Sequence, residues 1–142
     1  MDILNSILFW IHLVALAVGG AAVFGIPMTG AMLANASVES RPALVHVIER
    51  LSRAGRGAIG TLLVTGPVMV WLKYGGFADL SAWFWIKMAL VVIMVAGVIY
   101  AGLLMRRAAT GDAGAVRQQP MVGTVLLVTF VCIILSAVLA FG

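Results

Sequence analysis

The sequence predicts an all-α fold: an antiparallel four-helix transmembrane bundle with a short cytoplasmic amphipathic helix. Of its 142 residues, 63% are hydrophobic and 10% are charged, whereas an average soluble domain has roughly 25% charged residues. Four apolar runs are long enough to cross a hydrocarbon core of about 30 Å. Because backbone groups cannot stay unpaired in lipid, and because the alternating pattern of barrel strands is absent, these runs are expected to be helices of a single membrane domain, residues 1–142.

The connections between these runs are short, so consecutive helices are expected to be antiparallel neighbours. The first run is long and has no basic residue before it, which favours a permanent span over a cleavable signal. A glycine-containing loop is expected at 73–81, and a polar linker at 108–120. The expected spans are residues 7–34, 57–72, 82–105 and 121–141.

The basic residues predict the orientation in the membrane. Seven of the nine Lys and Arg residues lie between the first and second spans or between the third and fourth. By the positive-inside rule both loops are cytoplasmic, so both termini face outward, to the periplasm if this is a bacterial inner-membrane protein. The net charge of +4 therefore needs no nucleic acid to explain it. The outward ends of the first three spans carry all four tryptophans, an aromatic belt: Trp10, Trp71, Trp83 and Trp85.

Residues 42–54 predict the short amphipathic helix. Pro42 suits a first helical turn, and apolar side chains recur at helical spacing on one face. His46 falls on the opposite, charged face and is expected to be an ordinary surface histidine. The apolar positions are Leu44, Val47, Ile48 and Leu51.

Two ionisable residues lie well inside predicted spans. His12 comes seven residues after Asn5, and Lys87 six residues after Ser81, so both are expected about 10 Å below the outer surface. Such groups usually face the interior of a bundle and have a partner or a function. The alternatives are a lysine that extends to the headgroups and a histidine that only joins helices through a hydroxyl, of Thr65 or Ser136.

A face of small residues follows His12 along the first span. It contains Ala15, Gly19 and Ala22, with Val23 beside them. Small residues at helical spacing are typical of close helix packing. Next to an imidazole, a flat face of this kind can also admit a planar tetrapyrrole whose iron is bound by the ring nitrogen.

Several short motifs together resemble a known group of proteins. They are "WIH" in the first span, "VIERLSR" after it, Thr-Gly-Pro in the second span and "WFWIKMALVVIMV" at the start of the third. Across residues 7–107 they resemble the small four-span proteins grouped around the HemJ type of protoporphyrinogen oxidase and the membrane domain of copper resistance protein D. The resemblance implies a haem-associated helix bundle, with His12 as the iron ligand and Lys87 as a functional lysine.

The leading hypothesis from these observations is a membrane protein that binds haem b, with a redox or electron-transfer role. His12 would bind the iron, Lys87 would hold a propionate or act in catalysis, and Ala15 and Gly19 would border the porphyrin. The iron would be five-coordinate, or its sixth ligand would be Met69, Met88 or the His12 of a second protomer, the last of which would make a homo-oligomer. If the protein is an enzyme, an oxidoreductase with a quinone or another redox partner is expected. HemJ-like chains carry an arginine where this chain has Met28.

Two other functions stay open. Met28 and Met32 share a helix face, and thioether sulfur suits Cu(I), so a copper-handling membrane protein is one alternative. The other is a structural or accessory subunit without a cofactor. Cys132 is the sole cysteine, which excludes an intramolecular disulfide and a CxxC metal site.

Overall fold

The computed structural model describes residues 3–75 and 82–141, and within these ranges the chain forms four helices and no strand. Each helix is long and apolar enough to cross a membrane, so the predicted all-α class with four membrane-spanning helices is confirmed. Most of the expected 73–81 loop lies outside the described residues. The helices are α1 (Ile3–Ala34), α2 (Arg41–Tyr74), α3 (Ala82–Ala109) and α4 (Ala113–Phe141).

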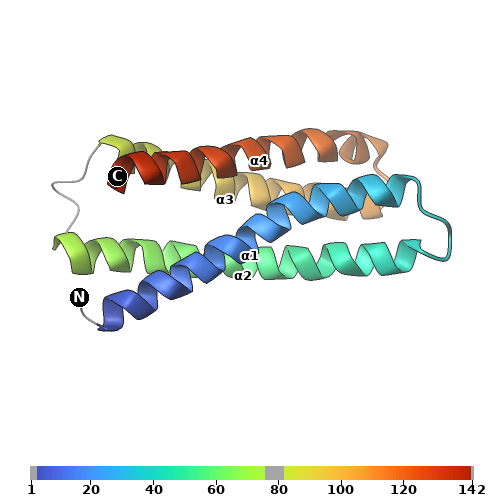
Figure 1. Ribbon diagram of the computed structural model, residues 1–142. Helices are drawn as coiled ribbons and strands as arrows, with labels where there is room; N and C mark the ends of the chain where they lie inside the picture. Colours follow the sequence, from blue (N-terminus) through green and yellow to red (C-terminus); the bar gives the residue numbers. More distant parts are fainter. Residues whose placement is uncertain (1–2, 76–81, 142) are drawn as a thin grey trace. The chain divides into compact units, whose positions relative to one another are not determined.

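The helices form two units, Met1–Asp79 and Leu80–Gly142. The first is a hairpin in which α1 crosses α2, and the second is a hairpin of α3 and α4 (Figure 1). Within each hairpin the two helices are antiparallel, as the short connections predict.

Small residues let α1 and α2 approach closely. A Cβ atom added at Gly55 would lie 2.9 Å from the Cβ of Ala22, and one at Gly19 would lie 3.8 Å from the Cβ of Ala58. Ala15, Gly19, Ala22 and Ala58 are all buried. Between helices in a bilayer, such contact replaces the hydrophobic effect as the source of association.

The predicted amphipathic helix 42–54 is the N-terminal part of α2, which continues without a break into the second span. Its apolar face packs on α1, since Leu51 Cδ1 would lie 2.9 Å from a Cβ at Gly25. His46 on the other face is exposed, as predicted. The expected boundary near residue 55 is absent because Gly55 serves the close contact with Ala22 and not a turn.

The second hairpin also differs from the expectation at its turn. The polar linker expected at 108–120 is shorter, because α4 begins at Ala113. Asp112 caps this helix: its Oδ1 accepts hydrogen bonds from the backbone N–H of Gly114 at 2.9 Å and of Ala115 at 3.2 Å. Pro120 therefore lies inside α4, where its ring removes the helical hydrogen bond to the carbonyl of Val116.

Candidate functional site around His12

His12 joins the two helices of the first hairpin. Its Nδ1 lies 2.7 Å from the hydroxyl oxygen of Thr65 on α2. Thr65 is 5% exposed and His12 is half-buried, so this polar contact is partly buried between the two helices. Of the two hydroxyl partners expected for His12, Thr65 is the one observed. Ser136, the other, donates its hydroxyl proton to the carbonyl of Ile133 in its own helix.

The hydrogen bonds of Thr65 fix the tautomer of His12. The hydroxyl of Thr65 donates its one proton to the backbone carbonyl of Thr61 at 2.8 Å. Its oxygen must then accept from His12, so the proton of the neutral imidazole is on Nδ1 and the lone pair is on Nε2. Metal-binding histidines have this same arrangement, in which one ring nitrogen binds the metal and the other donates to an oxygen.

The Thr-Gly-Pro motif of α2 lies against the imidazole. A Cβ added at Gly66 would be 3.7 Å from His12 Cε1, so the ring edge contacts α2 directly beside Thr65. Pro67 follows within the same helix. The sequence indicated Thr65 only as one of two possible hydroxyl partners. The adjacent Gly66 and Pro67 were the signal that could have distinguished Thr65 from Ser136.

The small-residue face next to His12 is covered by α2. Ala15 and Gly19 are both buried, and the residue that faces Gly19 is Ala58. Helix packing, one of the two interpretations of this face, is therefore observed. Contact of Ala15 and Gly19 with a cofactor stays a prediction that this packing does not favour.

Lys87 belongs to the other unit. It lies on α3 and is half-buried, whereas His12 is on α1 of the first hairpin. The two residues belong to different units, and their shared depth and joint role stay predictions.

Comparison with known proteins decides the family. The model of the family described as copper resistance protein D matches residues 45–140. The chain belongs to the copper resistance protein D family. No curated protein and no solved structure matches it.

Membership in the copper resistance protein D family confirms one part of the resemblance seen in the sequence. The HemJ-like part is not shown by a match and stays a prediction. The match includes Thr65 and Lys87 and begins after α1, so His12 lies outside it. With four apolar helices, this family member is an integral membrane protein in contact with the lipid bilayer; the inner membrane and the outward termini stay predictions.

Among the described residues of this copper resistance protein D family member, no group of three or more His, Cys, Asp or Glu side chains could hold a metal ion. The soft sulfur donors on α1 and α2 are the thioethers of Met28, Met32 and Met69. Met69 is half-buried and lies one turn after Thr65 on the same face of α2. Met28 and Met32 are 70% and 56% exposed, so their side chains lie on the outside of the first hairpin.

Proposed function

We propose that this protein handles copper in the membrane and binds Cu(I) through Nε2 of His12 in the α1–α2 hairpin. Family membership supports the metal, and the hydrogen bond from Nδ1 of His12 to Thr65 supports the ligand. That bond is the single observation on which the proposal rests, because it orients the imidazole and places its proton on Nδ1, the arrangement found in histidines that bind a metal through Nε2. Copper is then the cargo of the protein and not a permanent part of it.

The second ligand in this proposal is the thioether of Met69. Thioether and imidazole are both neutral donors, and soft thioether sulfur suits Cu(I), whereas Mg²⁺ prefers oxygen ligands. Met69 is on the same helix and the same face as Thr65, the partner of His12. The same hairpin would therefore supply both ligands and the residue that orients the imidazole.

The test is a competition titration of the purified protein with a coloured Cu(I) chelator in mild detergent. His12→Ala is expected to abolish binding, and Met69→Leu to weaken it by at least tenfold. The double variant Met28→Leu/Met32→Leu is the matched control and should bind Cu(I) as the wild type does. Loss of binding in the double variant with full binding in His12→Ala would move the site to the exposed methionines and contradict the proposal.

Haem b is the second candidate, because the nitrogen that suits Cu(I) also suits haem iron. The orientation of His12 by Thr65 favours it equally. The packing of Ala15 and Gly19 against α2 disfavours haem binding, since a porphyrin could not lie on the face that α2 covers and would have to approach His12 from another side. A Soret band in protein supplied with haem, lost in His12→Ala, would put haem ahead of copper. A structural or accessory subunit would bind neither.

A further inference from the structure

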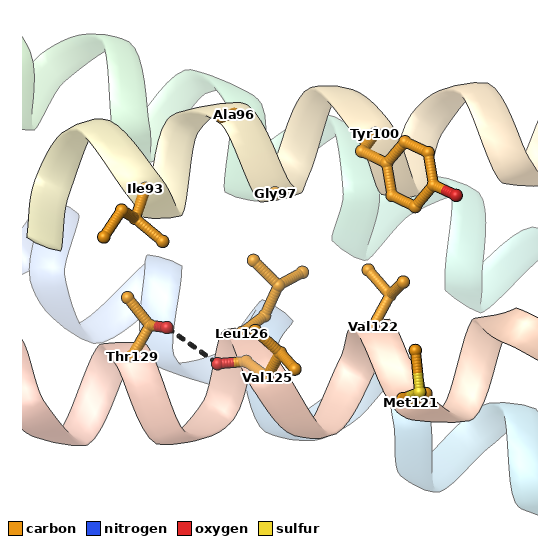
Figure 2. A pocket seen from close by; sticks show the side chains of 9 residues that line it. All are labelled: Ile93, Ala96, Gly97, Tyr100, Met121, Val122, Val125, Leu126 and Thr129. Carbon is orange, nitrogen blue, oxygen red and sulfur yellow. Dashed lines mark hydrogen bonds between the residues drawn. The ribbon is translucent and has the colours of Figure 1, made fainter.

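A groove of about 330 Å³ runs between α3 and α4 in the second hairpin. Figure 2 shows Ile93 and Thr129 at one end and Tyr100 and Met121 at the other. The wall is almost wholly apolar, since the hydroxyl of Thr129 donates to the carbonyl of Val125 in its own helix at 2.8 Å. The groove thus offers its occupant contact with hydrocarbon and no unsatisfied hydroxyl along its length.

One end of the groove is polar and leads to two arginines. At this end the hydroxyl of Tyr100 donates to the side-chain carbonyl of Gln118 at 2.8 Å and joins α3 to α4. Arg117 lies four residues before Met121, and Arg107 lies seven residues after Tyr100. These spacings place each arginine on the same helix face as its groove residue. Both arginines are exposed.

The charge at this end is positive. Arg106 adds a third exposed guanidinium to the α3–α4 turn. The carboxylate of Asp112 caps α4 through the backbone N–H groups of Gly114 and Ala115. The turn therefore presents more guanidinium than carboxylate charge next to an apolar groove.

We propose that this groove binds one acyl chain of an anionic phospholipid, with the lipid phosphate held by Arg117 and Arg107. An acyl chain needs only apolar contact, which the wall supplies, and guanidinium binds phosphate by charge-assisted hydrogen bonds. A quinone fits less well, because its carbonyls need donors and the proton of Tyr100 already bonds Gln118. The lipid belongs to the leaflet on the side of the α3–α4 turn, where basic residues attract anionic headgroups.

The test is native mass spectrometry of the full-length protein in detergent mixed with phosphatidylglycerol or phosphatidylcholine. The wild type is expected to retain phosphatidylglycerol at least fivefold more than phosphatidylcholine. Two changes should each lower the retained phosphatidylglycerol at least fivefold. One is the pair Arg107→Gln/Arg117→Gln, which removes the phosphate ligands; the other is Val122→Phe, which fills the groove.

Each change has a matched control. Arg50→Gln/Arg53→Gln removes two exposed arginines from α2. Val131→Phe adds the same bulk nine residues further along α4, on the opposite side of the helix from Val122. Both controls should retain the lipid as the wild type does. Equal retention of the two lipids, or an undiminished level in the arginine pair, would overturn the proposal whether or not Val122→Phe folds.

Discussion

Replacing Thr65 by valine is the sharpest perturbation of the proposed copper site, because it removes one hydroxyl and keeps the shape of the side chain. The Thr65 hydroxyl accepts the Nδ1–H bond of His12 at 2.7 Å in a position that is 5% exposed. When Cu(I) takes Nε2, the ring proton must remain on Nδ1. In Thr65→Val that N–H would then point at a methyl group.

A buried donor without an acceptor costs about 1 to 3 kcal/mol, and about 1.4 kcal/mol is a factor of ten in affinity. The penalty falls on the metal-bound state, since the metal-free ring is able to move its proton to the other nitrogen. Thr65→Val should therefore bind Cu(I) roughly 5- to 140-fold more weakly, a range that includes the effect of removing other outer partners of metal ligands.

The measurement is the Cu(I) dissociation constant by chelator competition in detergent. Thr61→Val is the matched control, because the Thr61 hydroxyl bonds only the carbonyl of Gly57 in its own helix, at 3.0 Å. Thr65→Ser should restore the affinity. If Thr65→Val and Thr61→Val bind Cu(I) with equal strength, Thr65 does not orient the ligand and the reasoning from the tautomer is wrong.

Three further predictions concern packing, Lys87 and topology. Gly55→Ala should destabilise the first hairpin by about 1 to 3 kcal/mol relative to Gly19→Ala in a detergent unfolding titration, because its Cβ would lie 2.9 Å and not 3.8 Å from the nearest Cβ; equal stabilities would refute the packing. Lys87→Met should leave Cu(I) affinity within twofold, since Lys87 lies outside the first hairpin, whereas a drop in haem retention would return it to the propionate role. A reporter active only in the cytoplasm, fused after Gly142, should be inactive, and activity would reverse the predicted orientation.

The helices were predictable from composition because lipid leaves a long apolar segment no other structure. The ends of the helices could not be predicted from composition. Pro120 suggested a helix boundary, yet Asp112 caps α4 eight residues earlier and the helix accommodates the proline. Likewise the sequence predicted a boundary between the helix 42–54 and the span 57–72, whereas α2 is continuous there and Gly55 lies against Ala22. Proline and glycine mark either a boundary or a contact, and only the packing partner tells which.

At the candidate site, the sequence singled out His12 because an ionisable side chain in a bilayer is costly. The sequence did not decide whether His12 bonds Thr65 or Ser136, since both carry a hydroxyl inside a span and their distances from the imidazole depend on how the helices pack. Whether the face around Gly19 packs against a helix or borders a porphyrin likewise depended on tertiary structure, because only the structure shows that α2 covers it. The α3–α4 groove was missed because its residues resemble those of any apolar span; the adjacent small residues Ala96 and Gly97 were the signal that could have indicated it.

Copper K-edge X-ray absorption of the protein loaded with one equivalent of Cu(I) tests the central claim most directly. An imidazole scattering pattern together with a sulfur shell is expected in the wild type, from His12 and Met69. His12→Ala should retain no copper once unbound metal is removed, while circular dichroism shows unchanged helicity because the hairpin packs through its small residues. A wild-type spectrum with sulfur or oxygen neighbours and no imidazole would contradict copper binding at His12.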